Sequence, residues 1–243
     1  MPWWDTLLYA MALGAEAFAF VPLAVALPRL RHIPYAFRPM IFYTIGLLFI
    51  WYLGRYGRVY LHNNIFCFHL TSVLEIGFLS QTFYRLVPHP TFRRIVQIGY
   101  VIFLGFAFAD AVFWHGFMQE TNIYARSFGN LLVIVYALYY ILLLTEQAVP
   151  AIEKRPDFLL CVSVLIFYSM PLLVTILLLY LERYKVYQFD FISLTPFILS
   201  AGVAAMFQAL MFARFPLDRP PRQALPTWLR WRWRPRKAPV TVE

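Results

Sequence analysis

Seven long apolar stretches, separated by short connections, constrain the fold of this 243-residue chain more than any other feature. Each stretch is long enough to cross a hydrocarbon core of about 30 Å, which takes about 20 helical residues. The composition agrees, because 61% of the residues are hydrophobic and only 14% are charged, unlike the balance of a soluble domain. We therefore expect an all-α, polytopic membrane protein, a bundle of seven transmembrane helices. Its domain covers residues 1–214, with spans near 7–28, 40–61, 64–87, 95–117, 127–147, 157–181 and 189–213.

The distribution of Lys and Arg predicts how this bundle sits in the membrane. Basic residues concentrate in alternate connections, which face the cytoplasm by the positive-inside rule. These connections hold Arg29, Arg31 and Arg38, then Arg85, Arg93 and Arg94, then Lys154 and Arg155; the others hold only Arg126, Arg183 and Lys185. We therefore expect the N-terminus outside, the C-terminus in the cytoplasm, and a location in the cytoplasmic (inner) membrane of a bacterial type of cell.

A proline-rich basic tail, residues 215–243, follows the last span. Its prolines prevent a long helix, and within it tryptophan alternates with arginine at Trp228, Arg230, Trp231, Arg232, Trp233 and Arg234. Tryptophan prefers the headgroup level, and clustered arginine is attracted to anionic lipid headgroups. We expect this tail to be a cytoplasmic anchor at the membrane interface, with docking of a protein partner as the alternative. We expect no binding of nucleic acid.

The predicted span near residues 64–87 carries polar side chains into the hydrocarbon region of the membrane. With about 100° between successive helical residues, Asn64, Thr71, Glu75 and Thr82 fall on a single face. A carboxylate at the bilayer centre costs at least about 2.5 kcal/mol, so Glu75 must point into a bundle, a wet cavity or a partner.

Ionisable residues inside the predicted spans gather in their outer halves, with Glu16 and Glu75 near the midplane. One interpretation is that Arg55 and Arg58, flanked by Gly54 and Gly57, pair with Asp110 or Glu75 and lock the helices together. A second is an outward-facing cavity that binds a ligand, and a third is a proton or ion path through Glu16 and Glu75. The candidate ligand-binding residues are Arg55, Arg58, Asn64, His69, Thr71, Glu75, Asp110, His115 and Glu16.

The sequence assigns no cofactor, metal or catalytic residue. The only lysines, Lys154, Lys185 and Lys237, lie outside the predicted spans, which argues against a retinal Schiff base. The histidines form no HxxxH pair, so a zinc-dependent intramembrane hydrolase is not expected. No nucleophile and base stand at helical spacing, which leaves an enzyme uncertain and makes a non-enzyme the preferred prediction.

These observations favour an integral membrane sensor that binds a ligand in an outward-facing polar cavity and signals through a cytoplasmic partner. The plan of seven short-looped helices resembles the membrane-embedded sensory modules of bacterial signalling proteins, in architecture and not in any motif. Two alternatives stay open. The chain is an accessory or structural subunit of a larger membrane complex, or it is an intramembrane enzyme that modifies a lipid.

Overall fold

The computed structural model describes residues 14, 18, 20–114, 116–146, 151–183 and 189–217, with the backbone alone at 171, 175–183 and 189–197. Throughout this part of the chain the fold is helical, and no strand forms. The long helices are α2 (Arg38–Tyr56), α3 (Ile65–Leu86), α4 (Pro90–Ala109), α5 (Ile123–Glu146), α6 (Pro156–Arg183) and α7 (Phe189–Ala213). Short helical turns are η1 (Leu27–Arg29), η2 (Gly57–Leu61), η3 (Asp110–Trp114) and η4 (Ile152–Lys154), of which η2 and η3 are π-helical.

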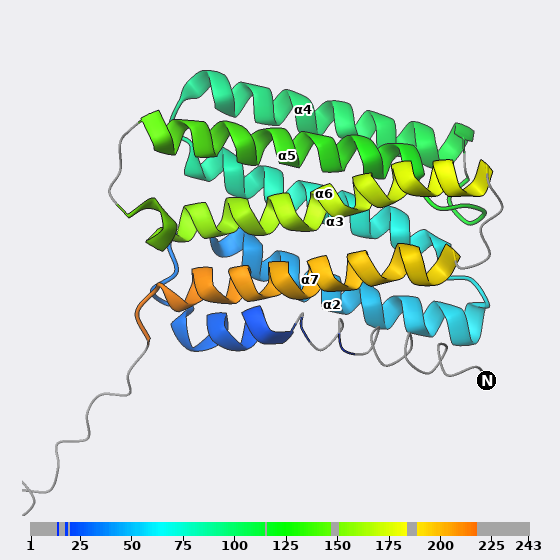
Figure 1. Ribbon diagram of the computed structural model, residues 1–243, viewed down its shortest axis with the longest axis horizontal. Coiled ribbons are helices and arrows are strands. Elements are labelled where there is room, and N and C mark those ends of the chain that lie inside the picture. Colours follow the sequence, from blue (N-terminus) through cyan, green and yellow to red (C-terminus); the bar gives the residue numbers. More distant parts are fainter. Residues whose placement is uncertain are drawn as a thin grey trace, which may run out of the picture.

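Consecutive long helices run in opposite directions along the long axis of the bundle (Figure 1). Consequently α3, α5 and α7 end where α2, α4 and α6 begin, and we call this the basic end because Arg29, Arg38, Arg85, Arg93, Arg155 and Arg214 lie there. α3 contacts α2, α4 and α5, and α5 in turn contacts α6. These two helices therefore connect most of the bundle.

Four helical segments are long and apolar enough to cross a membrane: Ile65–Leu86, Pro90–Trp114, Ile123–Glu146 and Pro156–Val174. Shorter apolar helices cover Phe20–Arg29 and Ile198–Ala213. The described part of the chain is thus all-helical, and the length and composition of its helices indicate a membrane protein. The count of seven spans and their orientation stay predictions, and half of the first predicted span lies outside the described residues.

Two helices begin earlier than hydropathy predicts. α4 starts at Pro90 instead of residue 95, because a proline suits the first helical position, where its missing N–H is not needed. α5 starts at Ile123 instead of 127, and the Arg126 amide bonds the Asn122 carbonyl at 3.0 Å. Arg126 therefore belongs to the first turn of α5, although the sequence analysis placed it in a loop.

Helices α3 and α5 lie side by side and run in the same direction (Figure 1). Their register is marked by a hydrogen bond from Asn122 to Ser72 and by the rings of Phe83 and Tyr136, whose centroids are 6.1 Å apart. Between these contacts, Gly129 lets the backbones approach. A Cβ added there would lie 2.7 Å from Ile76 Cγ1 and 2.8 Å from a ring carbon of Phe103.

Replacing Gly129 by alanine is expected to lower stability by roughly 1–3 kcal/mol, because the added methyl group overpacks the junction of α3, α4 and α5. The matched control is Gly105→Ala on α4, where nothing lies within 4 Å of the added Cβ. Thermal unfolding of both variants in the same detergent measures the difference. A midpoint for Gly129→Ala equal to that of Gly105→Ala would contradict the close approach.

Candidate functional site

Glu75 is the buried carboxylate around which the candidate site is built. It stands midway along α3, about 15 Å from either end of the helix at 1.5 Å per residue. Only 3% of the residue is exposed. Ile76 and Thr82 on the same helix are buried as well, so the polar stripe of α3 faces the bundle and not its surroundings.

Three other helices supply the groups around this carboxylate. Arg126 of α5 interacts electrostatically with Glu75. Tyr43 of α2 and Tyr168 of α6 are both buried, and their hydroxyl oxygens lie 3.4 Å apart, in hydrogen-bonding contact. Both phenols lie within electrostatic range of Glu75 and Arg126. We call Tyr43, Glu75, Arg126 and Tyr168 the Glu75 cluster.

The Glu75 carboxylate keeps its capacity to accept hydrogen bonds. Within the described residues, no side chain or backbone group donates a hydrogen bond to it. The phenols bond each other, and each phenol can both donate and accept. The cluster therefore combines a carboxyl group, a guanidinium group and two adaptable hydroxyl groups at mid-depth.

The connection between α4 and α5 lies across the first half of α3. Asn63 Nδ2 donates to the Met118 carbonyl at 2.7 Å, and Asn122 Nδ2 donates to Ser72 Oγ at 2.8 Å. His69 Nε2 donates to the Glu120 carbonyl at 3.1 Å, which places the proton on that nitrogen. These bonds hold residues 116–122 against the first half of α3.

Asp110 fastens the end of α4 to the start of α5. It is fully buried at the first position of η3, and its Oδ2 accepts a hydrogen bond from the Ala125 backbone N–H at 2.9 Å. Backbone N–H groups in the first turn of a helix lack internal partners, and a negative charge is favourable there. Asp110 thus fixes the helix on which Arg126 stands.

Asp110→Ala is expected to cost about 1–3 kcal/mol, because the buried Ala125 N–H loses its acceptor, whereas Asp110→Asn keeps an oxygen there and costs less. Amide hydrogen exchange across residues 122–128 should quicken in the alanine variant. Glu146→Ala, an exposed acid at the far end of α5, is the control. Identical exchange in the Asp110→Ala and Asp110→Asn variants would rule out this role.

The sequence-predicted site residues differ in where the structure places them. His69, Glu75 and Asp110 are buried, and each lies against α5 or the connection before it. Asn64 is the half-buried residue that precedes α3, and Thr71 donates to the Cys67 carbonyl at 2.7 Å. Glu16, His115 and the tail residues Trp228, Arg230, Trp231, Arg232, Trp233 and Arg234 lie outside the described residues.

Arg55 and Arg58 lie on the exposed surface of α2 and η2. The Arg55 guanidinium sits 4.8 Å from the centre of the Trp51 ring. Within the described part of the chain, no ion pair joins either arginine to Glu75 or Asp110. The reason is local: Gly54 and Gly57 face Cys67 and Phe66 of α3, and each arginine, one residue later, is turned about 100° away.

The sequence analysis missed Arg126, Tyr43 and Tyr168. Arg126 was read as a loop residue, although Asn122 before it is a favoured residue type at a helix N-terminus and could have signalled the earlier start. The two tyrosines carry no signal of their own among the 16 in the chain. For metal binding, the described residues contain no group of three or more His, Cys, Asp or Glu that could hold an ion.

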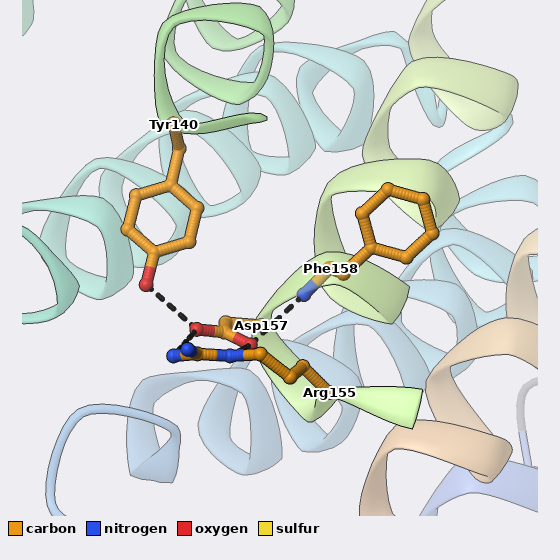
Figure 2. Close-up of polar contacts among 4 residues, drawn as sticks. All are labelled: Tyr140, Arg155, Asp157 and Phe158. Atoms are coloured by element: carbon orange, nitrogen blue, oxygen red, sulfur yellow. Dashed lines mark hydrogen bonds and ion pairs between the residues drawn. The ribbon is translucent and has the colours of Figure 1, made fainter. Parts of the chain in front are cut away.

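A second polar cluster lies at the basic end (Figure 2). Asp157, in the first turn of α6, accepts hydrogen bonds from Tyr140 Oη at 2.8 Å and from Arg155 Nη2 at 2.6 Å and Nε at 3.0 Å. The Asp157 bond raises the pKa of the Arg155 guanidinium, which therefore stays charged. We call Tyr140, Arg155 and Asp157 the Asp157 cluster; it joins the end of α5 to the start of α6.

Tyr140→Phe is expected to lower stability by about 1.5–3 kcal/mol, because it removes a buried hydrogen bond to an ionised group. Tyr139→Phe is the matched control, since the Tyr139 ring stacks on Phe92 and its hydroxyl has no hydrogen bond within the described residues. Equilibrium unfolding in detergent compares the two. Equal losses would show that the bond to Asp157 contributes nothing specific.

The chain was compared with protein families, with curated proteins and with solved structures. No family model, no curated protein and no solved structure matches this chain. No residue role therefore comes from a relative. The chemistry of the Glu75 cluster is the basis for a function.

Proposed function

We propose that this chain is a membrane sensor that binds a small polar ligand at the Glu75 cluster and passes the change to a cytoplasmic partner. The observation that carries the proposal is a buried carboxylate at mid-depth whose hydrogen-bonding capacity the described residues leave unused. Charged groups inside membrane spans are rare and costly, and they usually mark a binding or transport function. A purely structural carboxylate would be expected to use its acceptors within the bundle.

The cluster favours a particular ligand chemistry. Glu75 offers acceptor oxygens to a group with N–H or O–H donors, and Arg126 offers donors to an acceptor or an anion. The hydroxyls of Tyr43 and Tyr168 adapt to either partner. A small molecule that carries both donors and acceptors fits this set.

Two helices connect the Glu75 cluster to the basic end. α5 carries Arg126 near its start and Tyr140 near its end, and α6 carries Asp157 in its first turn and Tyr168 farther along. A shift of either helix at one cluster therefore moves a member of the other. In the proposed topology of seven helices with the N-terminus outside, this second cluster faces the cytoplasm of the cell, beside the basic tail and its partner.

Native mass spectrometry of the protein, released from its own membrane in mild detergent, tests the proposal. We expect wild type to retain a small molecule, and Glu75→Gln and Arg126→Gln to hold it roughly 10- to 100-fold more weakly, because each loses a charged hydrogen-bonding group. Glu146→Gln, which removes an exposed carboxylate, is the control. Equal retention by all four proteins would refute the assignment of the site.

An accessory subunit of a membrane complex is the second candidate, and one observation favours it. Only 17% of the apolar window in Pro90–Trp114 is buried. The outward side chains of this segment include Ile98, Val101, Phe108 and Phe113. A wild-type chain that carries no small molecule and co-purifies in fixed ratio with a second membrane protein would establish this candidate and reject the sensor.

A further inference from the structure

Two arginines at the corner between α3 and α4 lie over tyrosine rings. The guanidinium carbon of Arg85 lies 3.9 Å from the centre of the Tyr35 ring, and that of Arg93 lies 5.3 Å from the centre of the Tyr84 ring. Arg85 Nη1 also donates to the Tyr35 carbonyl, and Arg93 Nε to the Val87 carbonyl. Each side chain is thus ordered by two contacts.

Within the described residues, most N–H donors of these two arginines have no protein acceptor. A guanidinium has five N–H groups, and within the described residues Arg85 and Arg93 each spend one on a protein carbonyl. Val87 is two residues from Arg85, so both guanidinium groups belong to the same corner of the bundle. Stacking on a ring leaves the edge of a guanidinium available, and that edge matches two oxygens of a phosphate.

The surroundings of this corner are positive. Arg38 and Arg94 are exposed beside it, and between residues 20 and 114 the only acidic residues are Glu75 and Asp110. Glu75 lies at the middle of α3, and Asp110 lies at the opposite end of α4. Among the described residues, the acids of the basic end are Glu146, Glu153 and Asp157, which belong to α5, η4 and α6, and Asp157 is bonded to Arg155.

An apolar path leads away from the corner along α4. Arg94, Ile98 and Ile102 follow one another at intervals of four residues and therefore share a face of the helix. Ile95, Ile98, Val101 and Ile102 are all exposed, between 49% and 66%. Tyrosine at the headgroup level and apolar side chains below it are what a phospholipid meets at a membrane protein.

From the ordered guanidinium edges, the positive surroundings and the apolar path, we infer that the Tyr35–Tyr84–Arg85–Arg93 corner binds the phosphate of an anionic phospholipid whose acyl chains run along α4. A free phosphate would use the arginines but not the path, and an acidic protein would not need it. Basic pockets between transmembrane helices are an established type of headgroup site. This site is separate from the Glu75 cluster and does not depend on its function.

Titration of the purified full chain in detergent with short-chain phosphatidylglycerol, followed by native mass spectrometry, tests this site. We expect the double variant R85Q/R93Q to bind the lipid about 30-fold more weakly, because each arginine near an anionic group contributes about fivefold. The control R55Q/R58Q removes the same charge from the opposite end and keeps the affinity within about twofold. The basic tail is the same in both variants.

Two further measurements keep the outcome decisive. R85K/R93K retains the charge but not the fork or the stacking, and we expect its affinity to fall between wild type and R85Q/R93Q. Phosphatidylcholine should bind weakly to every variant. Equal losses in R85Q/R93Q and R55Q/R58Q, or full affinity in R85K/R93K, would overturn the site in favour of diffuse charge. Displacement of the lipid by millimolar inorganic phosphate would overturn the assignment to a lipid.

Discussion

A carboxyl group at the middle of an apolar helix stays ionised only where a positive charge or hydrogen bonds oppose it, because low-dielectric surroundings do not solvate the charge. Glu75 is in this position, and Arg126 of α5 is the cation that interacts with it electrostatically. Arg126 is brought there by an early start of α5, by the Asp110 carboxylate at its first turn and by the close approach at Gly129. The packing of α3 against α5 therefore also determines which groups surround Glu75.

The helical class and the membrane character could be predicted from the sequence, because hydropathy and length are properties of single segments. That Glu75 points into the bundle could also be predicted, because this too follows from the properties of a single segment. Its partner could not be, because hydropathy ends a span at the first charge and assigns Arg126 to a loop. The outward position of Arg55 and Arg58 depends on which face of α2 meets α3, and that is settled by contacts at Gly54 and Gly57 that no single helix reveals.

The two ends of the bundle use arginine in different ways. At the basic end, Arg85, Arg93 and Arg155 are ordered by rings, backbone carbonyls or a carboxylate. Toward the opposite end, Arg126 interacts electrostatically with the buried Glu75, and Arg55 lies over the half-buried Trp51 ring. Arginine suits all these settings because its planar guanidinium can stack and bond at the same time. The number of basic residues in each connection predicts the topology of the chain. The groups that an arginine contacts show whether it anchors the bundle or belongs to a binding site.

A double-mutant cycle on Glu75 and Arg126 is the most direct test of this account. Unfolding free energies of Glu75→Gln, Arg126→Gln and the double variant give the coupling between the two groups, free of their separate costs. The account predicts a coupling of about 1 kcal/mol or more for this pair, and additive effects for a parallel cycle on Glu75 and Arg55. Additive effects for Glu75 and Arg126, together with a coupling between Glu75 and Arg55, would contradict it and place a different face of α2 inside the bundle.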